Sequence, residues 1–217
     1  MNLVFMRECN QLKESILRQA DDVQARFGRA LKATADRDTG TLRQLIASDT
    51  EVDTREVEIE EECLKILALH QPVACDLRFV IAVLKINNDL ERIGDIAMNL
   101  ADRGIRLCAY EPHPLRAKIA EMGFSTRTML RQSVDALLSL DRAKALEVIQ
   151  QDDAVDDLNR EVIAAVVAEI PKTASPEALI LTHSMARDIE RIGDHATNIA
   201  EDVVYLIDGS IIRHQKT

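Results

Sequence analysis

Aromatic residues, glycine and proline are all scarce in this 217-residue chain. Tryptophan is absent, aromatic residues make up 3% of the chain, and it holds 7 glycines and 5 prolines. Alanine, leucine, isoleucine, glutamate and arginine dominate instead, which is typical of long helices. With 47% hydrophobic residues the chain can bury a substantial core. We therefore predict an all-α protein and exclude a β-rich fold.

The sequence has no apolar run of the roughly 18 residues that a membrane span needs. Its N-terminus, MNLVFMRECN, lacks the basic-then-apolar layout of a signal peptide. These two features predict a cytoplasmic protein.

The cysteines and the net charge exclude two further classes of protein. Cys9, Cys63, Cys75 and Cys108 form no CxxC pair, so we expect reduced, partly buried thiols rather than a zinc or redox site. A net charge of -10 opposes general binding to a phosphate backbone. We expect no nucleic-acid partner.

An internal repeat organises the chain. Residues 89–99 read DLERIGDIAMN and residues 188–198 read DIERIGDHATN, an offset of 99. Pro72 and Pro171 keep this offset, whereas upstream acidic positions match at 103. The first copy thus has four extra residues before its proline, about one helical turn. We predict two similar units, residues 1–110 and 111–217.

Prolines and capping residues divide each unit into three helices. Asp38, Asp141 and Ser175 are the expected N-caps, and Pro72 marks a turn. Short connections favour antiparallel neighbours. The predicted fold is a tandem repeat of two antiparallel three-helix bundles, with one six-helix bundle as the alternative packing. The expected helices are Asn2–Ala35, Thr39–His70 and Val73–Tyr110, then Leu115–Leu140, Arg142–Ile170 and Pro176–Asp208.

The third helix of each unit has an apolar face and an acidic face, as successive steps of 100° show. The apolar stripes face the core and consist of Val83, Ile86, Leu90, Ile93, Ala97 and Leu100, and of Thr182, Met185, Ile189, Ile192, Ala196 and Ile199. The acidic faces point outward. Gly94 and Gly193 lie inside these helices, which suggests the close approach of a neighbour.

Antiparallel packing of the second and third helices places acidic residues at the same level. The predicted neighbours are Asp53 with Glu91 and Asp49 with Asp95, centred on residue 72. In the second copy the corresponding pairs, centred on residue 173, are Asp156 with Glu190 and Asp152 with Asp194. Like charges so close require compensation by cations.

Two kinds of cation are candidates for this role. The first is arginine, because Arg92, Arg191, Arg55 and Arg160 lie beside the acids in the sequence. The second is a bound metal, since clustered carboxylates suit hard cations such as Mg, Mn, Ca or iron. His195 lies off the acidic sector, so we expect a core or surface histidine rather than a ligand.

The chain resembles the PhoU family of phosphate-uptake regulators. The resemblance rests on LALHQPVACDLRFVIAVLKINNDLERIGDIAMNLADR and LILTHSMARDIERIGDHATNIAEDVVYLIDG, and it extends over nearly the whole chain. It implies two three-helix bundles, often in a homodimer. It also implies negative regulation of the phosphate regulon, in which the protein links the ATPase of a phosphate ABC transporter to a phosphate-sensing histidine kinase. Association with the membrane is then peripheral, through partners only.

The resemblance also implies metal binding at acidic motifs, with Mg, Mn or Fe as the ion. The positions that match are Asp49, Asp53, Glu91 and Asp95 in the first half and Asp152, Asp156, Glu190 and Asp194 in the second.

Two other functions are alternatives to a metal-binding regulator of phosphate uptake: a di-iron enzyme and a structural adaptor. A di-iron bundle enzyme requires ExxH ligands, and no histidine follows an acid by three residues. The sequence also lacks GxxxxGK[ST], HExxH and GxSxG motifs, so we expect no enzymatic activity. The second rival, a structural helical adaptor without metal, shares the fold and stays open.

Overall fold

The computed structural model describes residues 3–48 and 50–210, without the side chains of residues 50–53. This part of the chain is almost entirely helical and contains no strand. None of the described helices has an apolar stretch that would cross a membrane. The elements are α1 (Leu3–Asp36), α2 (Thr39–Ala47), α3 (Thr50–His70), α4 (Ala74–Leu107), α5 (Arg116–Ser139), α6 (Arg142–Glu169), the 3-10 helix η1 (Ile170–Lys172) and α7 (Pro176–Asp208).

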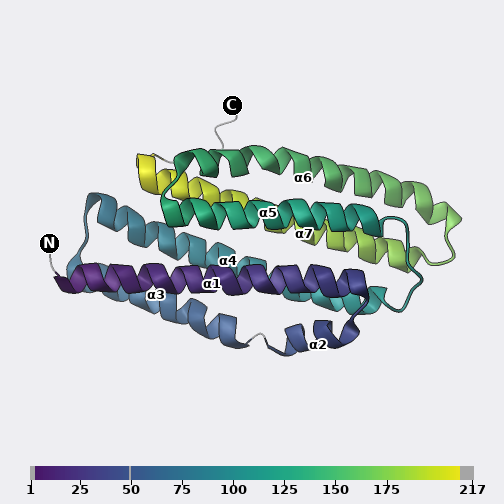
Figure 1. The fold of residues 1–217 in the computed structure, drawn as a ribbon, viewed down its shortest axis with the longest axis horizontal. Coiled ribbons are helices and arrows are strands. Elements are labelled where there is room, and N and C mark those ends of the chain that lie inside the picture. The colour runs from purple at the N-terminus through teal and green to yellow at the C-terminus, as the bar shows by residue number, and fades with distance from the viewer. Residues whose placement is uncertain (1–2, 49, 211–217) are drawn as a thin grey trace.

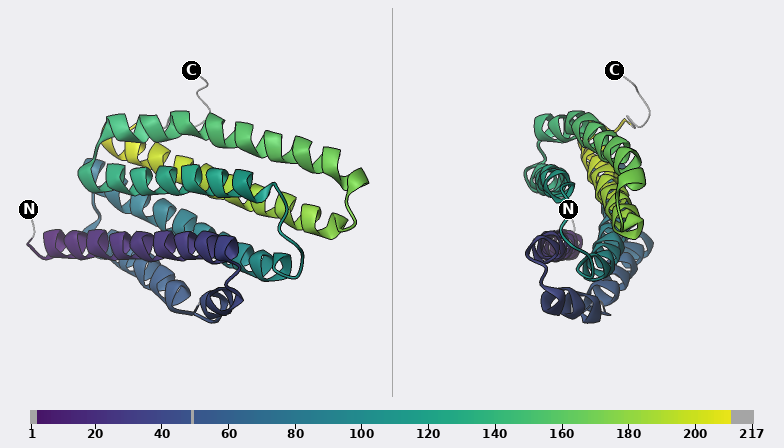
Figure 2. Two further views of the ribbon diagram at one scale, coloured as in Figure 1. Left: turned by 45° about the vertical axis from the view of Figure 1, so that its right-hand side comes forward. Right: turned by 90° about the vertical axis from the view of Figure 1, so that its right-hand side faces the viewer.

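The helices form two three-helix bundles side by side, as predicted. α1, α3 and α4 pack together with the short α2 at one end, and α5, α6 and α7 form the second bundle (Figure 1). α4 packs along α7 and α1 packs against α5, so the halves join through both pairs (Figure 2). Buried residues from both halves belong to one continuous hydrophobic core.

The core follows the predicted apolar stripes of α4 and α7. All twelve of these side chains are buried, which confirms the helical phase read from the sequence. Thr182, the one polar member, is 3% exposed and its hydroxyl donates to the carbonyl of Ala178 at 2.8 Å. A local bond of this kind lets a threonine occupy a buried helical position.

The prediction of one helix over Thr39–His70 is wrong, because that segment is divided into α2 and α3. α2 ends at Ala47, and Ser48 leaves the helix with φ −99° and ψ 16°. The Ser48 hydroxyl donates to the Leu45 carbonyl at 2.9 Å, and the Arg26 guanidinium donates to the Ser48 carbonyl at 2.7 Å. These side chains satisfy backbone groups that a continuous helix would pair internally.

Two of the three predicted caps are confirmed. The Asp38 carboxylate accepts from the Thr41 amide at 3.0 Å, and the Asp141 carboxylate accepts from the Ala143 amide at 3.0 Å. Ser175 precedes α7 as predicted, but its side chain makes no capping bond. Proline is the first residue of α7, which removes one of the free amides that a cap would bind.

A row of charged contacts crosses the seam between α4 and α7. Two of these contacts are the ion pairs Lys85–Asp202 at 3.0 Å and Arg103–Asp188, and the third is a hydrogen bond between His195 and Asp89 at 2.8 Å. All three aspartates are buried. Burial raises the pKa of Asp188 while the neighbouring arginines oppose that rise, Arg103 most strongly. Because loss of one partner would leave a buried charge, these pairs fix how the two halves join.

Candidate functional site

The acidic cluster of the second half lies where α6 and α7 approach each other. It consists of Asp152 and Asp156 on α6 and Glu190 and Asp194 on α7. A Cβ atom added at Gly193 would lie 3.6 Å from the Oδ1 atom of Asp152. This is an ordinary van der Waals distance, so the Asp152 side chain lies directly beside Gly193 of α7. This contact agrees with the register that pairs Asp152 with Asp194.

The carboxylates of this cluster are partly desolvated and repel one another. Partial burial, together with the charges of Asp194 and Asp156, raises the pKa of Asp152 to about 6. The pKa values of Glu190 and Asp194 are also raised, first by desolvation and then by neighbouring carboxylates. Although Asp194 is exposed, partial desolvation is the largest cause of the rise in its pKa. The cluster therefore stores electrostatic repulsion that a cation would relieve.

No described arginine forms an ion pair with the acidic cluster of the second half. Arg160 pairs with Asp157 at 2.5 Å, outside the cluster, and both side chains are exposed. Arg55, in the first half, pairs with Asp22 on α1. None of the four clustered acids forms an ion pair with a described lysine or arginine. The charge of Arg191 nevertheless opposes the rise in the pKa values of Glu190 and Asp194, so arginine compensates this half in part, without an ion pair.

The corresponding acids of the first half are partly compensated by arginine. The Nε atom of Arg92 lies 3.3 Å from Glu91, and its Nη1 atom lies 3.9 Å from Asp95. Partial burial and then the charge of Asp95 raise the pKa of Glu91, although Arg92 opposes the rise. Asp49 lies outside the described residues, as does the side chain of Asp53. The structure thus shows only the α4 half of this predicted cluster.

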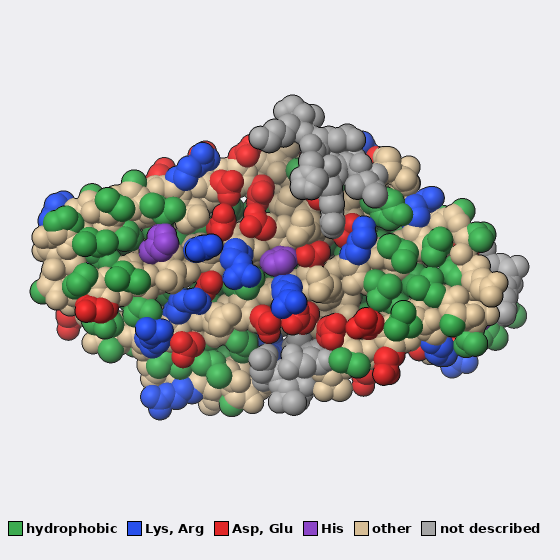
Figure 3. Space-filling model, turned by 180° about the vertical axis from the view of Figure 1, so that it is seen from behind, with side chains coloured by type: hydrophobic (Ala, Val, Ile, Leu, Met, Phe, Trp, Pro, Cys, Tyr) green, Lys and Arg blue, Asp and Glu red, His purple; other side chains and the backbone are tan. Residues whose placement is uncertain are grey.

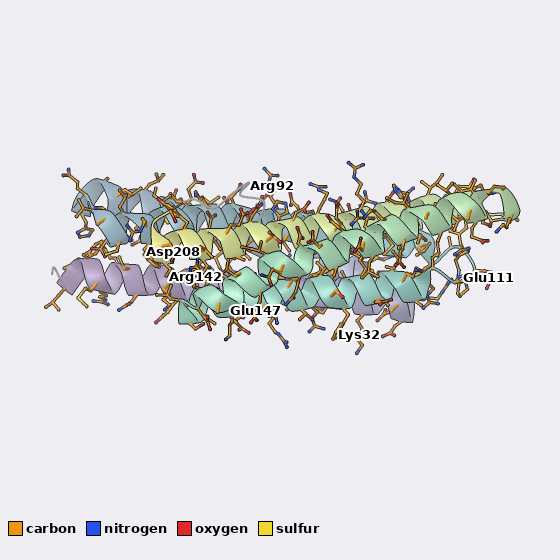
Figure 4. The ribbon with its side chains drawn as sticks, turned by 90° about the horizontal axis from the view of Figure 1, so that it is seen from above. Lys32, Arg92, Glu111, Arg142, Glu147 and Asp208 are labelled. Carbon is orange, nitrogen blue, oxygen red and sulfur yellow. The ribbon has the colours of Figure 1, made fainter. Side chains whose placement is uncertain are left out.

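Many of the acidic side chains of the molecule are concentrated on one face (Figure 3). Acidic side chains gather in two groups near the middle of the rear face, with basic side chains and a histidine between them (Figure 3). Arg92 points out from this face, whereas Lys32 points out from the opposite one (Figure 4). The second and third helices of each half supply this acidic face, because α1 and α5 cover the other side (Figure 2).

Carboxylate oxygens are the ligands that hard cations prefer. Among the described residues, however, no three His, Cys, Asp or Glu side chains converge closely enough to hold a metal ion as they stand.

A polar cleft between the halves was not identified from the sequence. It has a volume of about 630 Å³ and lies between α3, α4 and α7. Within it, Asp89 accepts hydrogen bonds from His195 at 2.8 Å and from Asn198 at 3.3 Å. His195 is therefore a partner of a buried aspartate, consistent with its expected place off the acidic sector. One sequence feature predicts this buried contact: Asp89 belongs to the repeated motif and lies next to the apolar stripe of α4, so its carboxylate needs a partner.

Comparison with known proteins identifies relatives over almost the full length. The PhoU domain model matches residues 16–104 and again residues 119–203. The phosphate-specific transport system accessory protein PhoU homologue of Pseudomonas putida is 34% identical over 212 residues, which is 97% of this chain and 83% of the relative. The Pseudomonas aeruginosa homologue is 35% identical over 212 residues, covering 97% and 88% of the two chains.

Two solved structures share the fold. The crystal structure of PhoU from Pseudomonas aeruginosa superimposes with a TM-score of 0.92 at 34% identity, covering 95% of this chain and 100% of that chain. The phosphate transport system regulatory protein PhoU from Streptococcus pneumoniae gives a TM-score of 0.89 at 27% identity, with 95% and 98% coverage.

Proposed function

This chain belongs to the PhoU family, and from this premise we propose that it regulates phosphate uptake as an accessory protein of a phosphate transport system. The duplicated PhoU domain, matched in both halves, carries the proposal. The role is regulatory rather than catalytic. Cells that lack the gene are expected to take up more radiolabelled phosphate than wild-type cells at high external phosphate. Equal uptake rates in both strains would refute the proposal.

The finer proposal is that the protein represses the phosphate regulon by linking the transporter ATPase to a phosphate-sensing histidine kinase. It acts as a homodimer in the cytoplasm and reaches the membrane through these partners alone. Affinity purification of the tagged full-length chain at high and low phosphate tests this link. Recovery of both partners at high phosphate is the expected result, and recovery of neither rejects it. Light scattering of the purified protein tests the dimer.

We further propose that each acidic cluster binds a metal ion, Mg, Mn or Fe, between its second and third helices. The support is the mutually repelling set on α6 and α7, which forms no ion pair with a described lysine or arginine and in which the pKa values of Asp152, Glu190 and Asp194 are raised. Proton and metal compete for the same oxygens, so binding should strengthen as the pH rises through about 6. The ion would stabilise the fold by mass action, by about 2.7 kcal/mol at one hundred times its Kd.

A melting titration with Mg, Mn and Fe(II) on metal-stripped protein tests this proposal. The double variant Glu190→Gln with Asp194→Asn is expected to lose most of the metal-induced rise in Tm. The double variant Glu91→Gln with Asp95→Asn should lose the part of the metal-induced rise in Tm that the first half contributes. Glu147→Gln, an exposed acid on α6 outside the cluster, is the matched control. Identical metal-induced shifts in all proteins would reject metal binding.

A structural adaptor without metal is the second candidate function. The contacts of Arg92 with Glu91 and Asp95 favour it for the first half, because this arginine already neutralises part of the charge. Such an adaptor needs neither a metal nor a response to phosphate, so loss of its gene would leave phosphate uptake unchanged and the protein would show no metal-dependent melting. The two measurements together therefore separate the candidates.

A further inference from the structure

An apolar groove lies on the side of the molecule opposite the acidic face. It runs between the end of α1, the start of α5 and the 108–115 connection, and its volume is about 740 Å³. Leu107 of α4 and Met185 of α7 are among the residues that line it, so it involves both halves. A cleft of this size with a mainly apolar lining is typical of a binding site.

One exposed aromatic residue stands in this groove. Of the four phenylalanines in the chain, Phe5 and Phe27 are buried, Phe79 is half-buried, and Phe124 is 73% exposed. The alanines at 117 and 120, also exposed, leave space on the same stretch of α5. A large apolar side chain beside an open apolar cleft is typical of a surface that is covered by a partner.

The Lys, Arg, Asp and Glu side chains that line the groove are all basic. Lys32, Arg116 and Arg127 line it, and no described Asp or Glu does, although the chain carries a net charge of -10. Arg116 donates to the carbonyl of Ala35. Lys32 and Arg127 are exposed and form no ion pair with a described residue. Free cations at the rim of an apolar groove complement a partner that is apolar and acidic.

We propose that this groove binds an amphipathic helix of a partner protein, with an apolar stripe flanked by Asp or Glu. The described part of the chain has no strand and hence no sheet edge to which an extended peptide could add. Two long helices, α1 and α5, instead form the walls, and a third helix packs between such ridges with apolar residues at i, i+3 or i+4, and i+7. The inference extends the proposed function, since an accessory protein needs a surface for its partner.

Photocrosslinking in the native host tests the groove directly. The full-length chain carries Phe124→p-benzoyl-phenylalanine, a replacement of similar shape, and the crosslinked peptide is sequenced by mass spectrometry. The expected peptide has acidic residues flanking a helical apolar stripe. Leu138→p-benzoyl-phenylalanine is the matched control, because Leu138 is also exposed on α5 but lies outside the groove. It should not yield this peptide.

Charge reversal provides the second arm. Arg127→Glu, added to the crosslinking variant, is expected to reduce the yield at least tenfold, and replacing the acids of the partner peptide with lysine should restore it. Because Arg127 is exposed, the substitution should not disturb the fold. A melting curve that matches that of the parent variant will confirm this. Crosslinks to lipid, to a second copy of the chain or to a basic segment would overturn the proposal. So would no crosslink, or an unchanged yield.

A phosphate-starvation reporter in the same cells separates this inference from the proposed function. If loss of the gene raises the reporter but position 124 gives no partner crosslink, the groove proposal fails and the regulatory role stands. If the crosslink forms but the reporter never responds, the docking surface stands and the regulatory role fails.

Discussion

Replacement of Asp152 by asparagine is expected to stabilise the metal-free protein. In the folded state the pKa of this carboxyl rises from its ordinary value of 3.8 to about 6, because of partial burial and the nearby charges of Asp194 and Asp156. At about 1.36 kcal/mol per pH unit, that gap corresponds to at most about 3 kcal/mol. Solvent reaches part of the side chain, so we expect about 1–2 kcal/mol. Asparagine keeps the shape and removes the charge.

The pH dependence follows from the direction of this shift. The folded protein holds the proton of Asp152 more tightly than the unfolded chain, so the carboxylate destabilises the fold fully only above about pH 6. As the pH falls toward 4, the carboxyl becomes protonated and the penalty disappears. The advantage of Asp152→Asn should therefore be largest at pH 8 and should fade between pH 6 and pH 4.

Thermal melts followed by circular dichroism in chelator, from pH 8 to pH 4, measure this effect. A change of 1 kcal/mol shifts the Tm of a domain this size by about 2–4 °C, so Asp152→Asn should gain about 2–8 °C at pH 8. Glu147→Gln, a substitution on the same helix outside the cluster, should change the Tm little. A variant that melts lower than wild type at pH 8, or whose advantage grows toward acid, would refute the repulsion argument.

Two further substitutions test contacts within the fold. His195→Ala should lower the free energy of unfolding by about 1–3 kcal/mol, because it leaves the buried carboxylate of Asp89 short of a donor; urea denaturation measures this, and a neutral effect would deny the bond a structural role. Arg26→Met keeps the aliphatic stem but removes the donor to the Ser48 carbonyl, so hydrogen exchange should show faster opening near the α2–α3 break. Unchanged exchange there would contradict the capping role of Arg26.

The repeat and the helical faces could be predicted from the sequence because both depend on local periodicity. The apolar stripe from Val83 to Leu100 is buried throughout, since a residue's position around the helix decides whether it faces the core. The register of α6 against α7 could also be predicted from the sequence, because a short connection fixes which residues of antiparallel helices lie side by side. Gly193 beside Asp152 is the structural counterpart of that argument.

The break after Ala47 depends on contacts that periodicity does not contain. Ser48 accepts its hydrogen bond from Arg26, which is 22 residues away on another helix. The pairing of Asp89 with His195 likewise joins residues 106 apart and depends on how the two halves pack. The groove at Phe124 requires the relative placement of α1 and α5. Such features arise from tertiary packing, so the single sequence did not reveal them.

Expression of a phosphate-starvation promoter in the native host tests the central claim most directly. The strains to compare at excess phosphate are wild type, a strain lacking this gene, and that strain complemented with the full chain. We predict high expression in the deletion strain and full repression after complementation. Unchanged repression in the deletion strain would contradict the proposed regulation of the phosphate system.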